Sequence, residues 1–172
     1  MQVAIVGLGR MGKNIVYHLL EQGVSVVAYN RSRDDVEEVA KRGAIPAYQL
    51  NDIPQKWQLN NSGQNNPIVV ILFVPSGHPV DEVLWGARSG GAQHEKDQIR
   101  VMAQKGLAEI LPRGSIIIDG GNSFYKDSIR RYELLKKHGI EFLDMGTSGG
   151  LEGARKGACL IVGGDEAIFT RV

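Results

Sequence analysis

The sequence has few of the features that mark secreted, membrane-spanning or metal-dependent proteins. Its 172 residues include one cysteine, Cys159, which excludes an intrachain disulfide framework and favours a reducing compartment, so we expect a cytoplasmic location. No apolar run is long enough to span a membrane, and the N-terminal segment lacks the basic region of a signal peptide. We therefore expect no membrane partner.

An excess of charge of one sign is also missing. The chain has 20 Lys and Arg residues against 19 Asp and Glu residues, which gives no basis for bulk binding of nucleic acid. Its four histidines are scattered without the spacing of metal ligands, and Ser148 has no evident histidine partner for a hydrolase triad. Any anionic ligand must therefore be held by a local site. Cys159 lies in an apolar run and is expected in the core.

Glycine, by contrast, is abundant, with 22 residues, many of them at the ends of apolar runs. The patterns predict strands at 2–6, 24–29, 44–48, 68–74, 115–119, 140–144 and 158–163. They predict helices at 10–22 and 33–43, from about 79, up to about 111, at 125–138 and from about 165. Residues 51–67 and 145–157 are expected to be mainly loop, and 86–96 an exposed insertion.

Strands and helices thus alternate with mostly short connections. This predicts an α/β fold, a Rossmann-type doubly wound, mainly parallel sheet in three α/β/α layers, forming one dinucleotide-binding domain over 1–172. In such sheets ligands bind at the carboxyl ends of the strands.

The first glycine loop, "GLGRMG", lies between a predicted strand and a predicted helix and fits G-x-G-x-x-G. Gly7 permits the tight turn, Gly9 lets a pyrophosphate approach the backbone, and Gly12 lets the helix pack closely on the strand. The helix N-terminus offers free N–H groups to the anion. The alternative is a glycine-rich turn without a ligand. The predicted cofactor contacts in this loop are Gly7, Leu8, Gly9, Arg10, Met11 and Gly12.

The second strand ends in "YNRSR", where enzymes that prefer NAD usually place an acidic residue on the ribose hydroxyls. Here Asn30 is neutral, and Arg31 and Ser32 could bind a 2′-phosphate. We therefore predict NADP rather than NAD. The alternative is that Arg31 and Arg33 are solvated residues opening the next helix, with Asn30 or Ser32 as its cap.

Two further strands end in "VPSG" and "DGGNS". Val74, Pro75 and Ser76 are expected near the nicotinamide, although a simple turn explains them equally well. Gly120 and Gly121 would let the backbone approach a ligand, and the amide of Asn122 could donate to a carboxylate or hydroxyl and accept from another group. An Asn-Ser helix cap is the alternative for this second loop.

A third loop, "MGTSGGLEGARKG", follows the strand at 140–144 and supplies hydroxyls and accessible N–H groups. Ser148, Gly149 and Gly150 are the substrate-binding candidates, with Thr147 beside them, and a purely structural loop is the alternative. We expect the three loops, on alternate strand ends, to converge on one cleft.

Together, "GLGRMG", "YNRS", "VPSG", "DGGNSFYKD" and "GTSGGLEGARKGACLIVGG" resemble the N-terminal half of the 6-phosphogluconate dehydrogenases, within the β-hydroxyacid dehydrogenases. The resemblance covers nearly the whole chain except 51–67 and 86–106. It implies that NADP takes a hydride from C3 of 6-phosphogluconate, that CO₂ leaves, and that the enediol becomes ribulose 5-phosphate, as in the pentose phosphate pathway and gluconate utilization.

By the same resemblance, Asn122 and the Ser148–Gly150 loop hold the carboxylate and hydroxyl end of the substrate. The resemblance also implies that Asn122 reaches the nicotinamide. The family's lysine base and glutamate acid are expected beyond Val172, with a helical domain that makes most of the dimer contact. The chain is therefore expected to be inactive and monomeric by itself, and the full-length protein a homo-oligomer. Ser76 in "VPSG" resembles the short bacterial form, which can prefer NAD. A 3-hydroxyisobutyrate-type dehydrogenase and a non-catalytic dinucleotide-binding module remain alternatives.

Overall fold

The computed structural model describes residues 1–60, 67–86 and 105–172, and within these ranges it has the predicted α/β architecture. Its strands are β1 (Gln2–Val6), β2 (Ser25–Tyr29), β3 (Ile45–Ala47), β4 (Val69–Leu72), β5 (Ile116–Asp119), β6 (Glu141–Ser148) and β7 (Cys159–Gly163). They form one sheet in the order β3-β2-β1-β4-β5-β6-β7, parallel except for the last pair. The prediction of a Rossmann-type, mainly parallel sheet is confirmed.

Helices cover both faces of the sheet. The described helices are α1 (Arg10–Glu21), α2 (Arg33–Ala40), α3 (Asp52–Asn60), α4 (His78–Trp85), α6 (Leu107–Ile110), α7 (Tyr125–His138), α8 (Gly150–Lys156) and α9 (Glu166–Phe169). Apolar residues of α1 and α2 pack on one face of the sheet, and those of α3, α4, α6 and α7 on the other. None of these helices combines the length and apolar character needed to cross a membrane.

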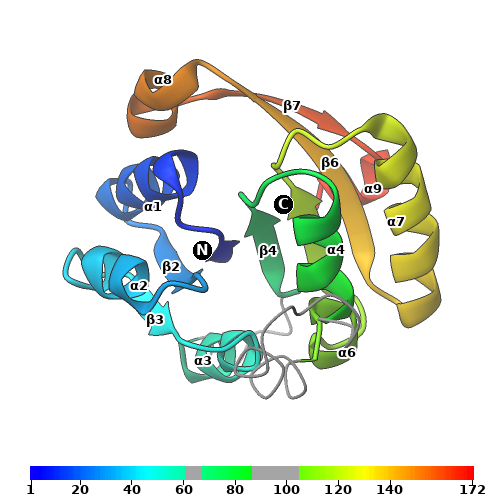
Figure 1. The fold of residues 1–172 in the computed structure, drawn as a ribbon, viewed down its shortest axis with the longest axis horizontal. Coiled ribbons are helices and arrows are strands. Elements are labelled where there is room, and N and C mark those ends of the chain that lie inside the picture. Colours follow the sequence, from blue (N-terminus) through cyan, green and yellow to red (C-terminus); the bar gives the residue numbers. More distant parts are fainter. Residues whose placement is uncertain (61–66, 87–104) are drawn as a thin grey trace, which may run out of the picture.

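Two segments predicted as loops are regular structure. In α3, Ile53 and Trp57 are one helical turn apart and both are buried, so the helix packs on the core despite its polar composition. The region after 144 continues β6 to Ser148 and then forms α8, which lies beside α1 in Figure 1. Residues 61–66 and 87–104, where most of the expected insertion falls, are outside the described residues.

The last strand also differs from expectation. β7 pairs antiparallel with β6 at the edge of the sheet, and most of its side chains are exposed. Cys159 is therefore exposed, and its predicted core position is wrong. Leu160 and Ile161 are 50% and 69% exposed, because no described element covers this strand.

Candidate functional site

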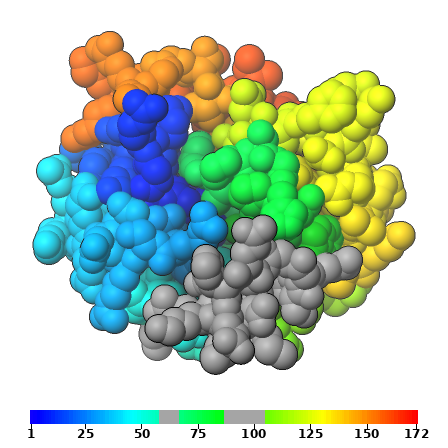
Figure 2. Space-filling view, viewed as in Figure 1, coloured from blue at the N-terminus to red at the C-terminus, as the bar shows by residue number. Residues whose placement is uncertain are grey.

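The register of the sheet brings the sequence-predicted loops to one edge. Val6 pairs with Leu72, Leu72 with Asp119, and Asp119 with Asp144, so the ends of β1, β4 and β5 lie at one level. The three loops after β4, β5 and β6 thus follow consecutive neighbours, and the expectation of alternate strand ends is wrong. Figure 2 shows the N-terminal segment in dark blue next to the green segment around residue 75 and the orange segment around residue 150.

In the first loop the three glycines meet three different steric demands. Gly7 has a positive φ of 100°, and a Cβ there would lie 2.5 Å from the carbonyl oxygen of Phe73. A Cβ on Gly12 would lie 2.0 Å from the carbonyl oxygen of Gly7. At Gly9 a Cβ would meet nothing within 4 Å. Packing of the chain therefore requires glycine at the first and third positions, whereas the second faces open space.

The other members of this loop divide between core and surface. Leu8 is 1% exposed and belongs to the core, so only its backbone can face a ligand, and its N–H already donates to Oδ1 of Asn30 at 3.3 Å. Arg10 is exposed and Met11 partly buried at the start of α1. Arg10 has no ion pair with the described residues.

After β2, both the oxygen and the nitrogen of the Asn30 amide form a hydrogen bond within the chain. It accepts from the N–H of Leu8 and donates from Nδ2 to Oδ2 of Asp35 at 2.7 Å. Ser32 stands at the N-cap position of α2 without a side-chain cap to the backbone, so the capping alternative does not describe it. Arg33 pairs with Glu37 and lies over the ring of Tyr48, 4.6 Å from its centroid.

Arg31 differs from Arg33 in its contacts. Its side chain is exposed and forms no ion pair with any described residue. Arg31 is therefore available to an anionic ligand, while Arg33 is engaged by Glu37 and Tyr48.

The loops after β4 and β5 pack directly on one another. A Cβ on Gly120 would lie 2.9 Å from the carbonyl oxygen of Leu72, and one on Gly121 would lie 2.5 Å from that of Val74. The glycine pair thus permits close approach of two segments of the chain itself, and the expected approach of a ligand stays a prediction. Val74 is half-buried, while Pro75 and Ser76 are exposed.

A buried arginine that the sequence reading missed joins these two loops. Arg131 on α7 is 0% exposed and donates from Nη1 to Oδ2 of Asp119 at 3.2 Å and to Oγ of Ser123 at 2.9 Å. Its Nη2 donates to the carbonyl oxygen of Gly77 at 2.9 Å, and its Nε to Asp81 at 3.0 Å. The signal was its helical spacing from Leu135, four residues on, which places both on the buried face.

Asp119, at the end of β5, is the partner that shapes the next loop. Its Oδ1 accepts from the N–H of Gly121 at 3.0 Å and its Oδ2 from the hydroxyl of Ser123 at 2.7 Å. Asn122, held between these two anchored residues, has φ of 59°, the left-handed conformation that asparagine tolerates better than most side chains. Its side chain is exposed and makes no hydrogen bond with the described residues.

The substrate-binding candidates lie farther from the sheet edge. β6 continues past the level of Asp144 to Ser148, which at the usual strand rise is about 13 Å farther along. Ser148, Gly149 and Gly150 are exposed there, at the start of α8. Thr147 does not fit the expected accessible loop, because its hydroxyl oxygen is buried without a hydrogen-bond partner.

α8 is anchored on α1. Ala154 is completely buried, and Arg155 forms a bidentate ion pair with Glu21 at the end of α1. The end of β6 is thereby held on the side of the sheet that carries the first glycine loop.

A group of charges also joins α1 to α2. Nζ of Lys13 lies 2.7 Å from Oδ1 of Asp35 and 2.5 Å from Oε2 of Glu38. The hydrogen bond to Asp35 is the main reason that the pKa of Lys13 is raised, and the same bond lowers the pKa of Asp35. All three groups are therefore charged near neutral pH.

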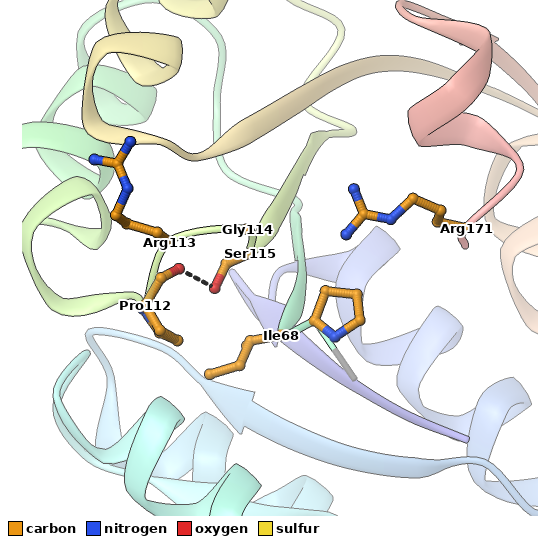
Figure 3. Close-up of a pocket in the computed structure, with 7 residues that line it drawn as sticks. Ile68, Pro112, Arg113, Gly114, Ser115 and Arg171 are labelled. Atoms are coloured by element: carbon orange, nitrogen blue, oxygen red, sulfur yellow. Dashed lines mark hydrogen bonds between the residues drawn. The ribbon is translucent and has the colours of Figure 1, made fainter. Parts of the chain in front are cut away.

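Two hollows elsewhere do not belong to this site. One is lined by Tyr17, Leu20, Glu21 and Arg42 on α1 and after α2. The other, about 240 Å³, lies at the amino ends of β4 and β5, where Figure 3 shows Ile68, Ser115 and Arg171. Ligands in sheets of this kind bind at the opposite edge. Among the described residues no three His, Cys, Asp or Glu side chains are grouped to hold a metal.

Comparisons with known proteins give a consistent picture. The family model described as the NAD binding domain of 6-phosphogluconate dehydrogenase matches residues 2–99 and 92–172, including both stretches outside the motif resemblance. The 6-phosphogluconate dehydrogenase of Chlamydia trachomatis is 37% identical over 164 residues, which are 95% of this chain and 29% of that protein. The NAD(+)-dependent enzyme of Bacillus subtilis is 32% identical over 173 residues, 98% of this chain and 31% of that protein.

Among solved structures, the 6-phosphogluconate dehydrogenase of Plasmodium falciparum, described with its cofactor NADP+ and with 6-phosphogluconate, matches with a TM-score of 0.72 and 28% identity. The match covers 99% of this chain and 32% of that one. The chain thus spans about a third of the length of these relatives.

Proposed function

The chain belongs to the family of NAD-binding domains of 6-phosphogluconate dehydrogenase, and from this premise we propose that it binds NADP within an enzyme that oxidises and decarboxylates 6-phosphogluconate. The observation that carries the proposal is the first loop. Two of its glycines are required by the packing of the chain, while Gly9 faces open space beside the start of α1. A helix N-terminus with an unobstructed glycine suits a pyrophosphate.

The preference for NADP rests on the loop after β2. No carboxylate takes the place where NAD enzymes usually hold the ribose hydroxyls, and Arg31 is exposed without an ion pair among the described residues. A guanidinium there can form charge-assisted hydrogen bonds to a 2′-phosphate.

Arg31→Ala tests the preference, with Arg33→Ala as its matched control. The first variant should lose NADP affinity about tenfold or more, with little change for NAD, because it removes the free cation. The control removes an arginine that is already paired with Glu37 and stacked on Tyr48. It should leave the ratio of the two Kd values unchanged. Equal Kd values for NADP and NAD in the unmodified chain would contradict the proposal.

The proposed substrate is inferred from the hydrogen-bond donors in the loops after β5 and β6. The exposed amide of Asn122 and the Ser148–Gly150 segment offer donors to a carboxylate and hydroxyls. A bound nicotinamide would supply the acceptor for the hydride that leaves C3 when the C3 hydroxyl is oxidised to a ketone. Loss of CO₂ from the 3-keto acid would then leave an enediol, and protonation of that enediol at carbon would give ribulose 5-phosphate. The role of these residues of the chain is to hold the carboxylate end in place for that reaction.

The chain's share of the enzyme is the cofactor-binding domain. We place the lysine base, the glutamate acid and most dimer contacts in sequence after Val172, with a cytoplasmic role in the pentose phosphate pathway and gluconate utilization. The native reading frame should therefore continue past Val172.

The decisive experiment combines binding and turnover. The 172-residue chain should bind NADP without reducing it. The product of the full reading frame should reduce NADP with 6-phosphogluconate and not with 3-hydroxyisobutyrate. Turnover of 3-hydroxyisobutyrate instead would assign a related hydroxyacid dehydrogenase, and a stop codon after Val172 would favour a binding module without chemistry.

A further inference from the structure

Lys13 lies between the first two helices, where it neutralises two carboxylates at once. Its ammonium is 2.7 Å from Asp35 and 2.5 Å from Glu38, and its side chain is 22% exposed. Glu38 also accepts a hydrogen bond from the hydroxyl of Tyr17 at 2.7 Å, and Arg42 lies over that ring, 4.7 Å from its centroid. Lys13 is nevertheless the cation in direct contact with both carboxylates.

Asp35 connects this cluster to the loop that follows β2. Its Oδ2 accepts from Nδ2 of Asn30 at 2.7 Å, and a hydrogen bond from Ser32 also lowers its pKa. Asn30 in turn accepts from the N–H of Leu8 in the first glycine loop. The charge on Asp35 therefore lies one hydrogen bond from two of the residues proposed to hold the ribose end of the cofactor.

We propose that Lys13 is a positioning residue that makes this site tolerant of a 2′-phosphate. Without it, Asp35 and Glu38 would place two uncompensated negative charges beside the loop, and a phosphate would be repelled more than the hydroxyl of NAD. Lys13 thereby supports the NADP preference that Arg31 provides, and it acts through Asp35 rather than as a ligand of the cofactor. This inference depends on the proposed dinucleotide binding.

The test measures Kd for NADP and for NAD on the 172-residue chain and on Lys13→Met. The variant should raise the ratio of the NADP Kd to the NAD Kd about three- to tenfold, as expected for charges several ångströms apart near a solvated surface. The increase should shrink in about 0.5 M salt, which screens such interactions. Lys13→Arg, which keeps the charge, should retain the original ratio.

Two further variants separate charge from packing. Asp35→Asn in the Lys13→Met background removes one freed carboxylate while keeping an acceptor for Asn30, so it should recover most of the NADP affinity. Lys137→Met removes the same charge from the last turn of α7, near the opposite sheet edge, and should leave the ratio unchanged. Equal weakening of both cofactors, or no recovery in the double variant, would overturn this inference. Failure of the unmodified chain to bind either dinucleotide would instead overturn the proposed function.

Discussion

Replacing Gly9 with alanine should weaken cofactor binding without harming the fold. The backbone there has φ −69° and ψ −170°, which alanine adopts without strain, and its Cβ would meet nothing within 4 Å. Stability should change by less than about 1 kcal/mol, and a small gain is possible because alanine restricts the unfolded chain. The new methyl group would occupy space that the pyrophosphate needs, so we expect the Kd for NADP to rise at least tenfold.

Gly12→Ala should instead destabilise the fold, and it serves as the matched control. Its methyl carbon would lie 2.0 Å from the carbonyl oxygen of Gly7, so the helix or the loop must move by more than 1 Å. Overpacking of this kind costs about 1–3 kcal/mol or more. Urea unfolding gives the stability of each variant, and titration with NADP gives the affinity. If Gly9→Ala binds NADP as tightly as the unmodified chain, the reasoning about the first loop is refuted.

Three further outcomes follow from the charges around Arg131 and from the second glycine loop. Asp119→Ala should lower the free energy of unfolding by about 3–5 kcal/mol, measured in urea, because it breaks the fully buried ion pair with Arg131 and leaves Asp81 as the remaining carboxylate on that guanidinium. Burial raises the pKa of Asp81, but hydrogen bonds from Arg131 and Arg130 outweigh it, so the net effect is a lowered pKa. The charged carboxylate therefore stabilises the fold above about pH 4, and this stabilisation is lost as the pH falls below that value. In an acid titration, Asp81→Asn should lose less stability than the unmodified chain. Gly121→Ala should be destabilised by at least about 1 kcal/mol, because its methyl carbon would lie 2.5 Å from the carbonyl oxygen of Val74.

The sheet could be predicted because its central strands are short β-branched runs that are buried on both faces. "AIV" in β1 and "VVIL" in β4 are apolar without interruption, as parallel strands covered by helices are. The glycines at 7, 9 and 12 could also be interpreted, because their spacing fits the turn from strand to helix.

The errors have physical causes. A polar composition hid α3, although Ile53 and Trp57 had the spacing of a buried helical face. Arg131 was passed over because arginine in an amphipathic helix is usually solvated. Its partners come from two distant stretches of the chain, 77–81 and 119–123. Cys159 was placed in the core because an apolar strand resembles a buried one, and periodicity does not reveal whether another layer covers it.

The Arg131 network explains why glycine is needed where the sequence suggested a ligand. Arg131 draws the loop after β5 toward the loop after β4 through Asp119 and the carbonyl of Gly77, and backbone then meets backbone at Gly121. Because these bonds lie within the chain, the loop is ordered before any ligand arrives. In this loop, the exposed side chain of Asn122 makes no hydrogen bond with the described residues, whereas Asp119 and Ser123 do. A site organised in this way loses little conformational freedom on binding, so its affinity depends on the exposed groups at its surface.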